Sequence, residues 1–183
     1  MVDKVEALRA CPVLTGFTDT GLQILAAVAR ERVYRTAQPL QVQGEPPKDA
    51  GVLFLATGRV RCEVKDAEGR TQGLGTLQPG DHLGGLRLFA DGTSPLHAIA
   101  ESEVVGLLID KPAFARLQKH KPNTAVKLLF ALAADFGKRL AENQSQFADF
   151  AVYAGIRANL STPTYVTTDY QLDHTPTLRG PGT

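Results

Sequence analysis

The chain has little of several features that would assign a partner or a special environment. It holds only two cysteines, Cys11 and Cys62, too few to staple a domain of this size, so we expect a reduced, cytoplasmic setting. Twenty basic residues against nineteen acidic ones leave a formal net charge of +1, and no overall field would draw the protein to nucleic acid or to an anionic surface. No window approaches the roughly 20 apolar residues of a membrane span, and the charged N-terminus does not fit a signal peptide. We therefore expect no membrane partner.

Catalytic and metal-binding motifs are also missing from the sequence. The histidines lack the spacing to Cys, Asp or Glu that a metal site needs; they are His82, His97, His120 and His174. No nucleophile elbow, P-loop or paired-carboxylate motif occurs. Asp81 lies beside His82, and Ser94 lies near His97, but neither pair has the surroundings of a catalytic triad. We expect no enzymatic activity and no metal.

A β-rich segment with regularly placed glycines fills the middle of the chain. Between residues 32 and 110 the hydrophobic period shortens toward two, and the apolar runs 52–55, 60–64 and 104–109 are separated by Gly, Pro and Asp. This pattern predicts a small antiparallel barrel or jelly roll.

Helical patterns flank the β-rich segment. Residues 1–30 form a lead-in in which Thr18 or Asp19 can cap a helix whose shared apolar face carries Leu22, Leu25, Ala26 and Ala29. After the sheet, Pro122 occupies a first-turn position of a helix expected to reach about Asn143. A second apolar set that starts at Phe147 either continues this helix or forms a following one. The four segments predicted in this way are 1–30, 31–110, 111–160 and 161–183.

The long helix carries an apolar stripe whose length allows two interpretations. Its members are Val126, Leu129, Ala133 (or, by spacing alone, Leu132), Phe136 and Leu140. Part of the stripe must pack against the chain's own barrel, but so long a stripe also suits a second copy, so the chain is expected to form a homodimer through this helix.

The last segment, 161–183, is rich in Thr and Pro and shows no helical period. We expect an extended or disordered tail. In one interpretation Tyr165 and Tyr170 anchor it as an added strand on a partner protein, and in the other it is only a linker end.

The order of these features resembles the cyclic-nucleotide-binding domain family over residues 8–140. Gly44 and Glu45 end one strand, Gly58 closes the next before a polar hairpin at 65–69, and residues 77–84 enter a glycine-containing turn. The resemblance implies an α+β, mainly β fold: an antiparallel β jelly-roll barrel with a short N-terminal helical segment and a long C-terminal helix.

The resemblance also locates a phosphate-binding cassette, but one without its polar side chains. The family pattern is Gly-Glu-Leu, a short helix, then Arg and a small residue. Here Gly84, Gly85 and Leu86 stand for the first three, residues 88–92 for the short helix and turn, and Pro95 for the arginine. Proline has neither charge nor N–H. Loss of a charge-assisted bidentate contact costs about 2–5 kcal/mol, so canonical binding of cyclic AMP or cyclic GMP is expected to be lost and no cofactor is expected.

Other protein groups in this stretch could bind an anion in place of the missing arginine and glutamate. Arg87 or His97 could turn into the pocket, and the amides of Gly84 and Gly85, with Thr93 and Ser94 nearby, could hold a different anion. In the opposite interpretation, Arg87 is a solvated helix residue and His97 an ordinary strand residue.

Two functions follow from the resemblance. The first is a non-enzymatic regulatory or scaffolding module that acts through another protein. The alternative is a ligand sensor that signals from the cassette to the long helix. Related transcription factors place a winged helix-turn-helix after that helix, and because no basic helix pair follows residue 147, we expect no direct DNA binding.

Overall fold

A computed structural model describes residues 2–46, 48, 50–88 and 91–153, without the side chains of Leu86 and residues 143–153. Tyr165 and Tyr170 lie outside the described residues, so their docking role stays a prediction. The chain divides into two compact units at Glu142 and Asn143, and the barrel lies in the first. The predicted boundaries at residues 30, 110 and 160 also stay predictions.

The lead-in to the barrel consists of α1 (Lys4–Arg9), the 3₁₀ helix η1 (Pro12–Leu14) and α2 (Asp19–Val28). Thr18 is the N-cap of α2, since its hydroxyl oxygen accepts a hydrogen bond from the Gly21 N–H at 3.2 Å. The face predicted to be apolar is buried, with Leu25 completely inaccessible. The helical lead-in therefore packs as its sequence pattern predicts.

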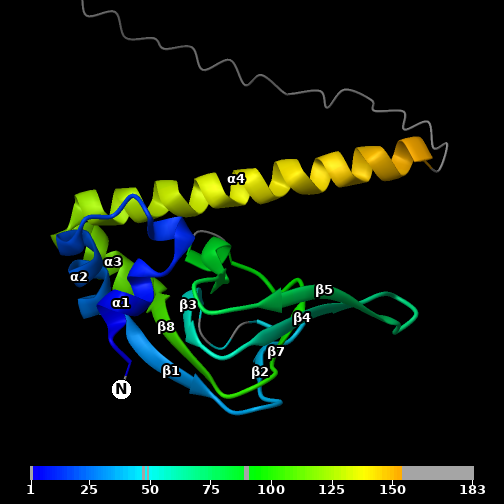
Figure 1. Cartoon of the computed structure of the whole chain (residues 1–183), viewed down its shortest axis with the longest axis horizontal. Coiled ribbons are helices and arrows are strands. Elements are labelled where there is room, and N and C mark those ends of the chain that lie inside the picture. Colours follow the sequence, from blue (N-terminus) through cyan, green and yellow to red (C-terminus); the bar gives the residue numbers. More distant parts are fainter. Residues whose placement is uncertain (1, 47, 49, 89–90, 154–183) are drawn as a thin grey trace, which may run out of the picture. The chain divides into compact units, whose positions relative to one another are not determined.

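The strands form two four-stranded sheets in which all the paired strands are antiparallel (Figure 1). The first sheet has the order β1 (Arg30–Tyr34), β8 (Val104–Asp110), β3 (Gly51–Thr57) and β6 (His82–Leu83). The second has the order β2 (Pro39–Gln41), β7 (His97–Ala100), β4 (Val60–Lys65) and β5 (Thr71–Leu77). Neighbours in space are mostly not neighbours in sequence, as in a jelly roll. The predicted mainly β fold is confirmed.

Strands β3 and β8 carry the core because both of their faces are buried. Phe54 pairs with Leu107 and packs with the helices, whereas the next residue, Leu55, packs inside the barrel. This alternation follows from the two-residue period of a strand. Buried faces on both sides also explain the continuous apolar runs of the sequence.

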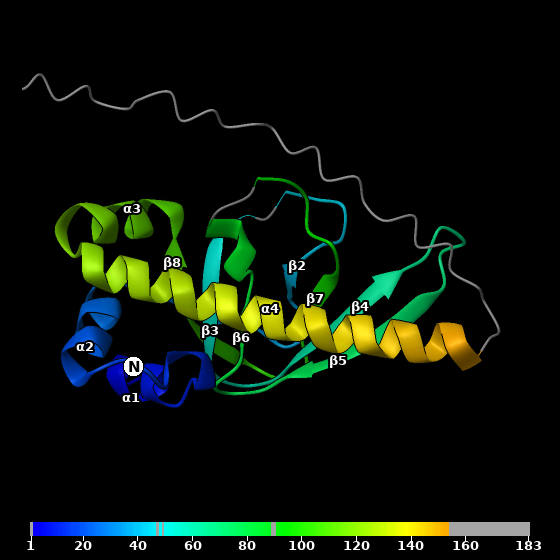
Figure 2. The ribbon, with the colours of Figure 1, turned by 90° about the horizontal axis from the view of Figure 1, so that it is seen from above.

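Two helices follow the last strand: α3 (Lys111–His120) and α4 (Pro122–Tyr153). Asp110 caps α3 by accepting a hydrogen bond from the Ala113 N–H at 2.8 Å, and it also pairs with Arg30. Pro122 begins α4 as predicted, and the helix continues past Asn143 to Tyr153, which is one of the two alternatives that the sequence left open. Figure 2 shows the first part of α4 crossing over β3 and β6.

The two faces of α4 differ in burial. Ala125, Leu128 and Leu132 are buried against the barrel and its helices. The adjoining face exposes the predicted stripe, and Phe130 beyond it has an exposed fraction of 70%. The stripe therefore contributes little to the fold of one chain, and the homodimer stays a prediction. No helix in the described part of the chain is long and apolar enough to cross a membrane.

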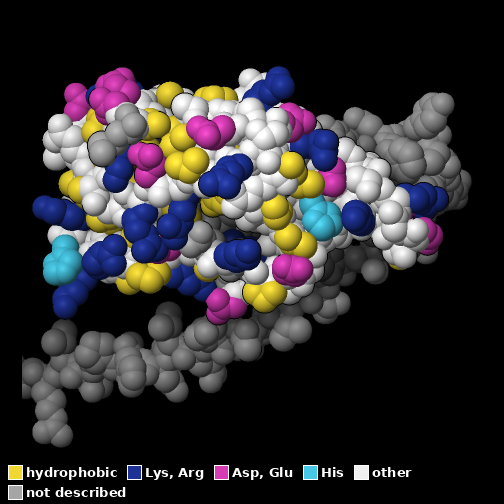
Figure 3. Space-filling model, turned by 90° about the horizontal axis from the view of Figure 1, so that it is seen from below, with side chains coloured by type: hydrophobic (Ala, Val, Ile, Leu, Met, Phe, Trp, Pro, Cys, Tyr) yellow, Lys and Arg dark blue, Asp and Glu magenta, His cyan; other side chains and the backbone are white. Residues whose placement is uncertain are grey.

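The side of the molecule seen from below differs from the outer face of α4. Figure 3 shows hydrophobic side chains there in small groups, with charged side chains of both signs between them. Scattered apolar groups of this kind are normal on a protein surface, whereas a continuous apolar row more often marks a contact site. The α4 stripe is a row of that second kind.

Candidate ligand cassette

The cassette begins with a turn that only glycine fits. Gly84 has a φ of +82°, and a Cβ there would lie 2.7 Å from the backbone oxygen of Gly51. The 3₁₀ helix η2 (Gly85–Leu88) follows at once, and the Arg87 N–H donates to the Gly84 oxygen at 2.8 Å. The short helix therefore lies earlier in the chain than the predicted residues 88–92, because it begins directly after the turn at Gly84.

Gly85 lies directly beneath α4. A Cβ at this position would be 3.3 Å from Cδ2 of Leu132 and 3.6 Å from the ring of His82. A larger side chain, such as the glutamate of the family pattern, would have to displace the helix or these neighbours. The change from Glu to Gly thus goes together with close packing of α4 on the cassette.

Arg87 is bonded within the protein. Its Nη2 donates to the backbone oxygen of Thr93, which closes the loop between η2 and β7. The loop also holds Asp91, which pairs with Lys111 at the start of α3. Arg87 and Thr93 are therefore brought together as candidate residues, but through a backbone contact of the loop itself.

Ser94 and His97 contact another segment, residues 43–45. Ser94 donates its N–H to Glu45 and accepts from Gly44, both at 2.8 Å, and Nδ1 of His97 accepts from the Gln43 N–H at 3.4 Å. The Ser94 side chain is buried, and its hydroxyl has no hydrogen-bond partner among the described residues.

A small cavity lies between the two sheets next to this turn. The cavity there has a volume of about 20 Å³ and is lined by Tyr34, Leu40, Gln41, Gly51, Leu53, Leu83 and Leu108. Such a space holds about one water molecule, whereas small-molecule sites usually have about 300–1,000 Å³.

A polar cluster that the sequence reasoning missed joins the cassette to α4. Nε2 of His82 lies 3.5 Å from Oδ2 of Asp135, and Arg139 donates to the same oxygen at 2.7 Å. Burial lowers the pKa of His82, and this effect exceeds the opposing attraction of Asp135. The sequence offered only a weak signal, the polar Asp135 and Arg139 four residues apart on a largely apolar helix. The described residues hold no group of His, Cys, Asp and Glu that would suit a metal.

Comparison with known proteins identifies the fold family. The family model of the cyclic nucleotide-binding domain matches residues 31–121. Among curated protein sequences none matches significantly. The N-terminal domain of a transcriptional regulator from Streptomyces coelicolor aligns with a TM-score of 0.65 and 24% identity, over 77% of this chain and 95% of that one.

Two further solved structures are similar. The catabolite activator protein of Thermus thermophilus aligns with a TM-score of 0.68 and 21% identity, over 76% of this chain and 63% of that protein. A cyclic nucleotide-binding domain from Methylobacillus flagellatus has a TM-score of 0.68 and 15% identity, over 80% of this chain and 81% of that chain. At these identities the alignments show a shared fold.

The comparisons also correct one expectation. We expected no direct DNA binding, and that exclusion is wrong, because the structural neighbours include the N-terminal domain of a transcriptional regulator. The argument had relied on the residues after position 147, and the segment that follows a domain does not limit what a protein of this fold does. The matched family, the two-sheet barrel and the retained turn at Gly84 agree: through residues 31–121 the chain belongs to the cyclic nucleotide-binding domain family, as a cyclic nucleotide-binding-like regulatory domain.

Proposed function

We propose that the chain is a non-enzymatic regulatory module that has lost canonical binding of cyclic AMP and cyclic GMP and acts through contacts with other protein chains. The observation that carries this proposal is the closure of the cassette by α4. Leu132 covers Gly85, where the family pattern has glutamate, and Pro95 supplies no charge where the pattern has arginine.

The energetics of the cassette support this proposal. A cyclic nucleotide brings a phosphate charge into a partly buried site, where a bidentate arginine normally compensates for lost hydration. Arg87 is the nearest replacement, but its guanidinium is already bonded to the Thr93 oxygen. This bond holds the guanidinium on the loop by Nη2, and the contact that an arginine at position 95 would make is worth about 2–5 kcal/mol.

The exposed face of α4 supports a contact with a second copy. Val126, Leu129, Ala133, Phe136 and Leu140 recur at alternating intervals of three and four residues, which is the a and d pattern of a coiled coil. In one copy these residues are exposed. A parallel pair of α4 helices would bury them, so we propose a homodimer as the first of these protein contacts.

One observation favours the alternative, a ligand sensor. The buried Ser94 hydroxyl has no partner among the described residues, and an unsatisfied buried polar group costs about 1–3 kcal/mol. A small ligand that bonds to this hydroxyl would remove that cost. Such a ligand would have to bind differently from a canonical cyclic nucleotide.

Calorimetry and thermal shift separate the two functions. The purified chain is titrated with cyclic AMP, cyclic GMP and cyclic di-GMP, each up to about a hundredfold the expected dissociation constant, where a bound ligand adds about 2.7 kcal/mol to stability. We expect no affinity tighter than about 100 μM for cyclic AMP or cyclic GMP. Low-micromolar binding of either would overturn the proposal. Binding that Ser94→Ala abolishes would support the sensor instead.

A further inference from the structure

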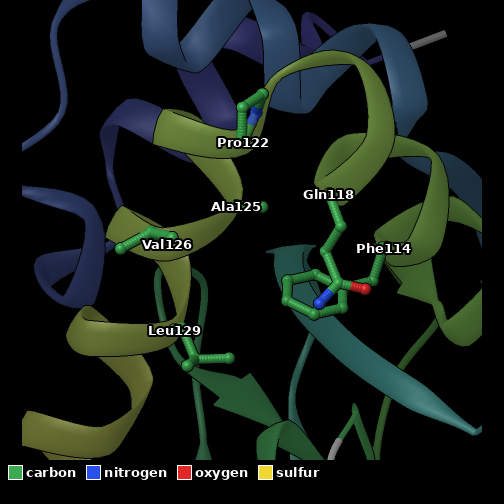
Figure 4. A pocket seen from close by; sticks show the side chains of 6 residues that line it. All are labelled: Phe114, Gln118, Pro122, Ala125, Val126 and Leu129. Carbon is green, nitrogen blue, oxygen red and sulfur yellow. The ribbon is translucent and has the colours of Figure 1, made fainter. Parts of the chain in front are cut away.

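A hollow between α3 and α4 is left unfilled by the fold of one chain. Its volume is about 250 Å³, and its lining comes from Phe114, Gln118, Pro122, Ala125, Val126 and Leu129. In Figure 4, Phe114 and Gln118 extend from α3 toward the space beside α4. A cavity of about 150 Å³ is enough for a benzene ring, so this hollow can take one aromatic side chain.

The heptad pattern of α4 relates this hollow to a particular residue of a second copy. With Val126 and Leu129 at positions a and d, Ala125 is a g position and Phe130 is an e position. In a parallel two-stranded coiled coil, an e residue lies beside the g residue of the other helix that precedes it by five positions. Phe130 of the second copy therefore lies beside Ala125, at the wall of the hollow.

Phe130 has no such environment within its own chain. Its exposed fraction of 70% is the highest among the exposed large hydrophobic residues in the described part of the chain. Removing an aromatic side chain from water is favourable, and aromatic residues commonly anchor interfaces by filling a pocket on the partner.

The next e and g positions show the complementary arrangement. Leu132, a g residue, already fills its side of α4 because it packs on Gly85. The e residue that would face it from the second copy is Gly137, which has no side chain and open space for at least 4 Å around the place where a Cβ would lie. The e position is thus a phenylalanine, Phe130, where the facing g residue borders the hollow, and a glycine, Gly137, where the facing g residue is the large Leu132. An antiparallel pair would not join these e and g positions, so the correspondence favours the parallel one.

We propose that Phe130 of each copy inserts into the α3–α4 hollow of the other copy and fixes the parallel register of the dimer. This inference rests on the proposed homodimer and adds its anchoring contact. The hollow is then a docking site for a second copy of this chain, and the two insertions are related by the dimer's twofold axis.

Crosslinking between two different cysteine variants tests the contact. Phe130→Cys and Gln118→Cys proteins are prepared separately, mixed, and treated with a short bis-maleimide. Both native cysteines are buried, so wild-type protein serves as the blank. We expect a crosslinked dimer in the mixture and not in either variant alone. Ala134→Cys, an exposed b position of the same helix, is the matched control and should not crosslink to Gln118→Cys.

Dimer affinity gives a second measurement. Phe130→Ala should weaken dimerisation roughly tenfold or more in sedimentation, the usual effect of removing an interface anchor, and should leave the melting temperature of the dilute monomer unchanged because the side chain is exposed. Leu74→Ala, an exposed leucine on β5, should leave both unchanged.

The outcomes separate this inference from the proposed dimer. A dimer that forms without the 118–130 crosslink, and that Phe130→Ala leaves intact, would overturn the inserted aromatic while the dimer stands. A mass near the 19.6 kDa of one chain at high micromolar concentration would overturn both.

Discussion

The contact between Gly85 and Leu132 can be tested by placing the family's glutamate back into the cassette. In Gly85→Glu the new Cβ would lie 3.3 Å from Cδ2 of Leu132, closer than ordinary van der Waals contact, and the rest of the side chain needs further space. Overpacking of this kind costs about 1–3 kcal/mol. For a domain of this size that lowers the melting temperature by roughly 3–9 °C.

Leu132→Ala supplies the second arm of a double-mutant cycle. Leu132 is 4% exposed, so its truncation alone should cost about 2–5 kcal/mol. If Leu132 is what crowds position 85, the double variant should be more stable than the sum of the single changes predicts, by about 0.5–3 kcal/mol. Urea unfolding of the four proteins measures this coupling.

The same variants test the ligand argument. Pro95→Arg added to Gly85→Glu restores both polar side chains of the family pattern, but we expect clear affinity for cyclic AMP only when Leu132→Ala also makes room. Additive stabilities, together with cyclic AMP binding that is equally tight with Leu132 present, would refute the idea that α4 closes the cassette. Gly137→Ala is a useful control, since it meets nothing within 4 Å and should stabilise α4 by about 0.5–1 kcal/mol.

Three further results are expected. Because the folded-state pKa of His82 is lowered mainly by burial, against the attraction of Asp135 and Asp81 and with the help of Arg139, the folded protein binds fewer protons than the unfolded chain. Stability should therefore fall as the pH drops below about 6.5, and urea titrations should show a flatter profile for His82→Phe than for His120→Gln. Gly84→Ala should cost more than Gly69→Ala, because both have positive φ but only Gly84 would place a Cβ against a backbone oxygen; equal losses in urea unfolding would contradict the geometry. Burial raises the pKa of the Cys11 thiol to about 11, so it should resist alkylation at pH 8 until the chain unfolds, and rapid labelling in native buffer would contradict this.

The strands and the first helices could be predicted because their sequence signals are local. The runs at 52–55 and 104–109 are continuous because β3 and β8 are buried on both faces, and Thr18 caps α2 through an atom three residues away. The signal for the start of α4, the proline at position 122, is also local. The sequence left open whether this helix continues past Asn143 or a second helix follows, because the position of a helix end without a stop signal depends on more than pattern. The structure shows one helix that continues to Tyr153.

The cassette was harder to predict because its decisive contacts join distant residues. Alignment with the family pattern placed its short helix at 88–92, but the positive φ of Gly84 starts η2 at Gly85. His82 looked like a polar turn residue, and only the structure brings it to Asp135, on a helix that begins at Pro122. The sequence could not separate Leu132 from Ala133 as the inward residue. The structure buries Leu132 and exposes Ala133.

This difference of one position decides how the two proposed surfaces share α4. With Leu132 turned toward Gly85, the a and d residues Ala133 and Phe136 face outward, and the side of the helix that closes the cassette adjoins the side available to a second copy. A side chain at position 85 that pushed Leu132 away would rotate or lift the helix. It would therefore also shift the seam, the row of a and d residues that a second copy would contact. We therefore expect closure of the cassette and the proposed dimerisation to be coupled through α4, so that Gly85→Glu should weaken the dimer although position 85 lies outside the seam. Sedimentation of Gly85→Glu beside Leu74→Ala, which changes an exposed leucine on β5, measures this effect. An unchanged dimer affinity in a destabilised Gly85→Glu protein would show that the two faces of α4 act independently.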